Sequence, residues 1–67
     1  MRFLRLKDVK EKTGLSKSAI YSKVKEGEFP MNVSIGSRTV AWLESDINEW
    51  LERRIRARDK AVKQYLD

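Results

Sequence analysis

Two glycines, Gly14 and Gly27, bracket the stretch that most constrains how this chain can fold. Ser16 follows the first glycine closely and is a favoured helix N-cap, because its hydroxyl can accept a hydrogen bond from an unpaired amide of the first turn. Glycine just past a last turn ends helices, because it tolerates the left-handed conformation. The sequence therefore predicts a short helix over residues 16–26, preceded by a connection of only three residues, 14–16.

This predicted helix has two different faces. Ile20 and Val24, four residues apart, lie on one face and are suited to packing against a core. The other face is polar, and no acidic residue occurs before Glu26. A helical face that combines lysines with hydroxyl groups fits the major groove of DNA. We therefore interpret residues 16–26 as a candidate recognition helix.

Size and composition exclude several classes of protein. Sixty-seven residues allow one small domain. The chain has neither Cys nor His, which excludes disulfides, the common zinc sites and the usual nucleophilic triads. We expect no enzyme activity, no cofactor and no metal.

Charge and hydropathy indicate where the protein works and what it meets. No apolar run approaches the roughly 20 residues that span a bilayer, and the charged N-terminus is unlike a signal peptide. We expect a soluble intracellular protein that is not associated with a membrane. Fifteen Lys and Arg against ten Asp and Glu give a net charge of +5, which favours a polyanionic partner such as nucleic acid.

The segment before Gly14 predicts a second short helix. Leu6, Val9 and Leu15 recur on one side, while the charged residues between them face water, so a helix of about two turns is predicted over residues 6–13. Two short helices joined by three residues that include glycine are typical of a helix-turn-helix. Residues 1–5 alternate enough to add a short edge strand.

A β-hairpin is predicted after the helices. Residues 32–35 and 38–42 alternate polar and apolar side chains, and Gly36-Ser37 between them suits a tight two-residue loop. Four apolar side chains of this hairpin are expected to cover the helices: Val33, Ile35, Val40 and Trp42.

A third helix is predicted to begin at Ser45 as its N-cap, with acidic residues in the first turn that suit the helix dipole. Its core residues are expected to be Ile47, Trp50, Leu51 and Ile55, and both Trp42 and Trp50 are interpreted as core. The predicted fold class is mainly α with a small β-hairpin, a reduced winged helix-turn-helix over residues 1–58. Residues 59–67 are predicted to form a basic C-terminal helical extension or a frayed tail.

Several sequence blocks recur in the order and spacing of a known family. The blocks are 5–9 (RLKDV), 13–21 (TGLSKSAIY), 27–30 (GEFP), 36–42 (GSRTVAW) and 44–51 (ESDINEWL). Over residues 3–58 the chain strongly resembles the AlpA family of phage and prophage regulatory proteins. The resemblance implies a winged helix-turn-helix similar to MerR-type and excisionase proteins, and a role as a small DNA-binding regulator of a mobile element. Residues 59–67 lie outside it.

The candidate DNA contacts form three groups. On the recognition helix they are Ser16, Lys17, Ser18, Tyr21, Ser22 and Lys25. On the hairpin, or wing, they are Gly36, Ser37, Arg38 and Thr39. Lysines that could touch phosphate are Lys7, Lys10 and Lys23.

Each candidate also has a plainer alternative. The helix face could simply be solvated, and Tyr21 could lie over the hairpin. Arg38 is the candidate for the minor groove, whose narrowed form has enhanced negative potential, but it could instead pair with Glu28 or Glu44. The basic run over residues 53–63 could be a solvated helix, a phosphate contact or a contact with a neighbouring copy.

Together with these residues, the resemblance implies a sequence-specific protein that binds double-stranded DNA in a mobile genetic element. It would work in the bacterial cytoplasm, associated with the nucleoid. It would act as a transcriptional regulator, as an excisionase that helps a tyrosine-type integrase, or as both. Other copies of the same chain on adjacent sites are a further expected partner. The alternative is a small protein-interaction module that inhibits or adapts a phage or host protein, binds it regardless of salt and ignores duplex DNA.

Overall fold

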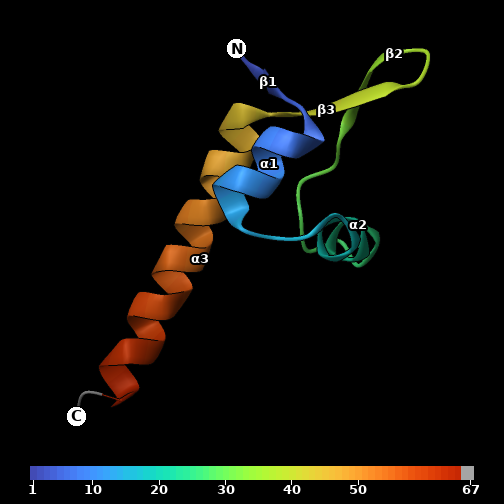
Figure 1. The fold of residues 1–67 in the computed structure, drawn as a ribbon. Coiled ribbons are helices and arrows are strands. Elements are labelled where there is room, and N and C mark those ends of the chain that lie inside the picture. The colour runs from blue at the N-terminus through green and yellow to red at the C-terminus, as the bar shows by residue number, and fades with distance from the viewer. Residues whose placement is uncertain (66–67) are drawn as a thin grey trace.

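The computed structural model describes residues 1–65, with side chains through residue 60. The elements in order are β1 (Phe3–Leu4), α1 (Leu6–Thr13), α2 (Lys17–Lys25), β2 (Val33–Gly36), β3 (Thr39–Leu43) and α3 (Glu44–Tyr65). Figure 1 shows α1 and α2 below the strands, with α3 running away from them. The predicted fold class, mainly helical with a small wing-like hairpin, is confirmed.

The connection between α1 and α2 is held by local hydrogen bonds. Gly14 has φ 75°, and its amide donates to the Lys10 carbonyl at 2.8 Å. The Thr13 hydroxyl donates to the Val9 carbonyl at 2.7 Å and accepts from the Leu15 amide at 3.2 Å. Because glycine takes this left-handed conformation without strain, α1 ends where the sequence predicted.

Both ends of α2 also follow the prediction. Ser16 Oγ accepts a hydrogen bond from the Ala19 amide at 3.1 Å, so Ser16 is the N-cap. At the other end Gly27 has φ 75°, and its amide donates to the Val24 carbonyl at 3.1 Å. The Glu28 amide donates to the Lys23 carbonyl at 2.8 Å, which completes the paired bonds of a Schellman motif.

The strands form one antiparallel sheet in the order β1-β3-β2. β1 is the predicted N-terminal edge strand. In the hairpin, Ser34 pairs with Val40, and the next pair is Gly36 with Thr39, so Ile35 is a bulge. The two turn residues are therefore 37 and 38. The prediction that Gly36-Ser37 forms the loop was wrong by one residue. Because Ile35 is an extra, unpaired residue in β2, Gly36 still pairs with Thr39 and belongs to the strand.

The core joins every part of the domain. Its buried members are Leu4, Val9, Ile20, Phe29, Trp42 and Ile47, flanked by the half-buried Leu6, Leu15, Val24, Trp50 and Leu51. Trp42 is fully buried, and its Nε1 donates to the Pro30 carbonyl at 2.9 Å. This bond satisfies the polar atom of the indole and ties the loop before β2 to the middle of the sheet.

Two predictions about buried hairpin residues were wrong. Val33 and Ile35 are 38% and 44% exposed. Val33 pairs with Ala41, whose side chain lies on the opposite face of β3 from Trp42, because successive strand residues point to opposite faces. Ile35 belongs to the bulge near the exposed end of the hairpin. Only β3, and not β2, turns a large side chain towards the helices.

The third helix differs from the prediction at its start and in its core face. α3 begins at Glu44, directly after β3, and the Glu44 amide donates to the Arg2 carbonyl at 2.8 Å. Ser45 therefore lies inside the first turn and is not the N-cap. Ile55 is 49% exposed, because the body of the domain ends near Leu51 and α3 continues beyond it.

Trp50 lies at the rim of the core. It is half-buried, its Nε1 donates to the Glu28 carbonyl at 2.8 Å, and its ring meets Phe29 edge-on with centroids 4.8 Å apart. Residues 59–65 of the predicted tail continue α3, and residues 66–67 lie outside the described part of the chain. No helix in the described residues is long and apolar enough to cross a membrane.

Candidate DNA-binding surface

The outer face of α2 displays the predicted recognition residues. Ile20 is buried and Val24 half-buried, which turns the remaining face outward. The six candidates are all exposed: Ser16, Lys17, Ser18, Tyr21, Ser22 and Lys25. Ion pairs among the side chains that the structure describes do not involve any lysine of α2. The exposed Lys17 and Lys25 therefore keep their positive charges for an external partner.

Tyr21 connects this face to the sheet. Its ring packs edge-on against Trp42, with centroids 6.1 Å apart and planes at 62°, while 37% of the residue remains exposed. Tyr21 therefore does lie over one strand of the hairpin, β3, as the alternative predicted, but it stays partly exposed. The same packing restrains the ring, and the exposed part of Tyr21 remains accessible to a partner.

The wing tip brings the second group together. Gly36, Ser37 and Arg38 are exposed and Thr39 is half-buried. Arg38 is the only charged residue of the segment 29–43, and among the described side chains it makes no ion pair with Glu28 or Glu44. Its charge is therefore free to meet an anion.

The sequence gives Gly36 a candidate contact role, but its backbone needs no special freedom. Its φ is not positive, and an added Cβ would meet Thr39 at an ordinary 3.4 Å. Any role of Gly36 at this surface therefore comes from its place at the tip of the wing.

The candidate phosphate contacts differ in exposure. Lys7 and Lys10 are exposed on α1, whereas Lys23 is half-buried on α2. Two other basic side chains are less available to phosphate, because Glu44 pairs with Arg2 at 3.5 Å and with Lys12 at 3.6 Å. Sequence reasoning missed this pairing, because the residues come together only when β1 and α1 pack beside the start of α3.

The net charge is concentrated in the helix-turn-helix and the wing. Residues 1–43 contain nine Lys and Arg against four Asp and Glu, whereas residues 44–67 contain six of each. The whole surplus of +5 therefore belongs to residues 1–43. A polyanion would be attracted chiefly by that part of the chain.

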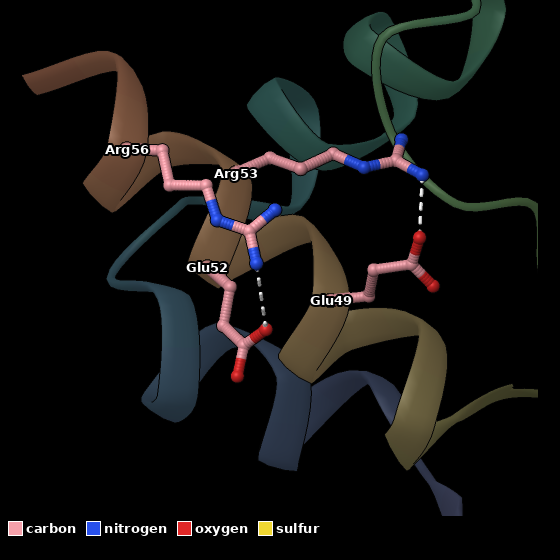
Figure 2. A network of polar contacts seen from close by, with 4 residues as sticks. All are labelled: Glu49, Glu52, Arg53 and Arg56. Carbon is pink, nitrogen blue, oxygen red and sulfur yellow. Dashed lines mark hydrogen bonds and ion pairs between the residues drawn. The ribbon is translucent and has the colours of Figure 1, made fainter. Parts of the chain in front are cut away.

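The basic run of α3 is largely compensated within the helix. Figure 2 shows two pairs of side chains one turn apart, Arg53 with Glu49 and Arg56 with Glu52. Arg58 also pairs with Asp59 at 2.8 Å. The two pairs in Figure 2 join residues four apart, and exposed pairs with this spacing stabilise a helix by a few tenths of a kcal/mol each. The acidic residues in the first turn of α3, Glu44 and Asp46, also complement the helix dipole.

A groove of about 480 Å³ lies between residues 27–30 and α3. Phe29 and Trp50 contribute aromatic surface, and the charged lining comprises three carboxylates and two guanidinium groups. This mixed lining distinguishes the groove from the uniformly basic face of α2. Across the described residues, no group of three or more carboxylates is placed to hold a metal ion.

Known proteins match nearly the whole of this arrangement. The model of the family described as prophage CP4-57 regulatory protein (AlpA) matches residues 2–55. An uncharacterized protein, ORF88 of Enterobacteria phage P4, is 46% identical over 59 residues, which are 88% of this chain and 67% of that protein. The DNA-binding transcriptional activator AlpA of Escherichia coli K12 is 35% identical over 60 residues, which are 81% of this chain and 86% of that protein.

The matched residues 2–55 include both helices of the helix-turn-helix, the whole sheet and the first half of α3. The resemblance found in the sequence is thereby confirmed. The chain belongs to the AlpA family of prophage regulatory proteins.

Proposed function

We propose that this protein is a regulator that binds double-stranded DNA sequence-specifically in a mobile genetic element. The observation that carries the proposal is the outer face of α2, where Lys17 and Lys25 are exposed and no acidic residue occurs, on a chain whose net positive charge belongs to residues 1–43. The name of the Escherichia coli relative, a DNA-binding transcriptional activator, supports the same conclusion. The protein acts by binding and not by catalysis, in the bacterial cytoplasm.

In this proposal α2 enters the major groove. Lys17 and Ser18, in the first turn, approach base edges, since recognition helices read bases with their N-terminal residues. Tyr21, which packs against Trp42, contacts a thymine methyl or a phosphate with its exposed part. Lys25 and Lys23 reach the flanking backbone, where contacts set register without reading sequence.

The wing extends the contact to the neighbouring minor groove. Arg38 enters it, because a narrow minor groove concentrates negative potential and attracts arginine. The small side chains beside it, Ser37 and Thr39, allow a close approach. Lys7 and Lys10 on α1 lie against phosphates next to the major-groove site. About five phosphates are neutralised in all.

The same contacts serve two kinds of regulation. At a promoter they act in transcription, which is the role printed in the name of the Escherichia coli relative. At an integrase attachment site they act in excision beside a tyrosine-type integrase. A footprint on the DNA of the mobile element assigns the role, since a promoter means transcription and an attachment site means excision.

The test of DNA binding starts from duplexes selected out of a random pool by the purified protein. Fluorescence anisotropy on a selected duplex should give a log K that falls with log salt at a slope of about −4 to −5, at ~0.9 per neutralised phosphate. No selected sequence, or a slope near zero, refutes the proposal. Salt-independent capture of a protein would instead favour the interaction module.

A further inference from the structure

The groove between residues 27–30 and α3 is separate from the surface proposed for DNA. None of the candidate DNA contacts lines it. Its lining carries three carboxylates and two guanidinium groups, a net charge of −1 on a chain of net charge +5. Its volume of about 480 Å³ falls within the roughly 300–1,000 Å³ of ordinary binding pockets. The groove is therefore suited to a partner other than DNA.

Two aromatic side chains give the groove a fixed apolar surface. Phe29 belongs to the core, and the Trp50 ring meets it edge-on with centroids 4.8 Å apart. The Trp50 Nε1 donates to the Glu28 carbonyl at 2.8 Å, which holds the indole against the segment that follows α2. Because these contacts exist without a ligand, a partner that packs on the two rings need not order them first.

The charges along the α3 wall of the groove change sign from one end to the other. Asp46 lies one turn before Trp50, and Arg54 lies one turn after it. At about 1.5 Å per residue, Asp46 and Arg54 are about 12 Å apart along the helix axis. The groove therefore has an acidic end, an aromatic centre and a basic end.

The charges at the two ends are not compensated within the described part of the chain. Among its side chains Asp46, Glu28 and Arg54 form no ion pair, whereas Glu49 and Arg53 pair with each other. Figure 2 shows this pair beside the segment that leads away from α2. Asp46 is also half-buried. A cation and an anion of a partner would thus each meet an opposite charge that is available.

We propose that the groove binds a short segment of another protein, with a basic and an acidic residue on either side of an apolar one. The basic side chain pairs with Asp46, the acidic one with Arg54, and the apolar one lies on Phe29 and Trp50. In an extended segment, charged residues four positions apart span about 13 Å, which matches the groove. The two charges of a free amino acid are too close together to reach both ends.

A random hexapeptide library displayed on phage, selected against the purified full chain, supplies the probe. Enriched peptides should carry opposite charges four positions apart with an apolar residue between them. The most enriched peptide is then synthesised and added to ¹⁵N-labelled protein. The chain has two tryptophans, of which Trp50 lines the groove and Trp42 is fully buried, so the indole signal of Trp50 should shift more. Absence of enriched peptides, or shifts confined to residues outside the groove, overturns the proposal.

Asp46→Asn and its matched control Asp8→Asn test the acidic end. Each aspartate lies in the first turn of a helix and forms no ion pair with a described side chain, and each change removes one negative charge. Asp46→Asn should weaken peptide binding about three- to tenfold, as expected for a half-buried ion pair. Asp8→Asn should change it by less than about twofold. Equal losses in the two variants refute the assignment of the groove.

Arg54→Ala and Arg38→Ala test the basic end and the separation from DNA together. Arg54→Ala should weaken peptide binding about three- to tenfold and leave DNA binding nearly unchanged. Arg38→Ala should show the reverse pattern, because Arg38 lies on the wing and outside the groove. Loss of peptide binding in Arg38→Ala but not in Arg54→Ala would contradict the proposal.

This inference does not rest on the proposed function, because the peptide titrations contain no DNA. If the protein fails to bind duplexes, the expected peptide results stay the same, and a failed peptide selection leaves the DNA titrations as they are. A further control is the protein alone at rising concentration. Shifts of the Trp50 indole signal in that series would identify a second copy as the occupant and overturn the proposal, whereas a constant signal supports a different protein.

Discussion

Replacing Arg38 by Ala separates the effect of position from that of total charge. The matched control is Arg54→Ala on α3, so both variants have a net charge of +4. Both arginines are exposed, and neither takes part in an ion pair with another described side chain. If attraction depended on net charge alone, the two changes would weaken DNA binding equally.

The expected loss of DNA affinity is larger for Arg38→Ala than for Arg54→Ala, because the two arginines lie in parts of the chain with different net charge. Arg38 is the only charge on the wing, so its loss should weaken binding by about 1–3 kcal/mol, or roughly 5- to 150-fold. The salt slope should become shallower by about 0.9, the contribution of one contact. Arg54 lies in a part of the chain without net charge, and its loss should change affinity less than about twofold.

Anisotropy titrations at four salt concentrations give both the affinity and the slope for each variant. Thermal unfolding followed by circular dichroism should show unchanged midpoints, since surface substitutions away from caps and core change stability by under about 0.5 kcal/mol. An equal loss of affinity in both variants would refute the placement of the interface. A loss confined to Arg54→Ala would assign the DNA contact to α3.

Three further predictions, two of them with a matched control substitution, test the interface and the fold. Lys17→Ala should weaken binding by about 1–3 kcal/mol in the same titration while Glu11→Ala does not, and the reverse order would mean that the wrong face was chosen. Ser16→Ala should lower the free energy of unfolding in urea by about 1 kcal/mol, because it removes the N-cap bond from the Ala19 amide. The control Ser45→Ala should lower it by under about 0.5 kcal/mol. A loss in Ser45→Ala as large as in Ser16→Ala would show that Ser45 caps α3. Trp42→Ala should lower the free energy of unfolding by roughly 3–5 kcal/mol. Because a domain of this size has a total free energy of unfolding of ~3–10 kcal/mol, the variant should be unfolded. A cooperative transition near the wild-type midpoint would contradict the core assignment.

The local sequence was sufficient for the helix-turn-helix. Gly14, Ser16 and Gly27 act through hydrogen bonds to residues within five positions along the chain, so the bounds of α1 and α2 could be predicted without knowing the fold. The exposed face of α2 follows from the same local periodicity. That its residues lie on the surface together was therefore predictable. That they touch DNA stays a prediction.

The ion pairs within α3 depend on a spacing that the sequence itself contains, although by composition residues 53–63 look like a basic run. Arg53 and Arg56 each follow a glutamate by four residues, which places the partners one turn apart. The tertiary structure adds the pairing of Glu44 with Arg2 and Lys12, which lie far from it in sequence.

Burial in the sheet was decided by tertiary structure alone. Alternation shows that Val33 and Trp42 are apolar strand positions, but which face meets the helices depends on the pairing register. The bulge at Ile35 and the pairing of Val33 with Ala41 put Val33 outside, although Trp42 is fully buried. Likewise, the start of α3 at Glu44 reflects the bond from its amide to the carbonyl of Arg2, which precedes the neighbouring strand β1. Short-range caps act within one turn and can be predicted from sequence, whereas strand register and helix entry require partners that only the folded chain brings near.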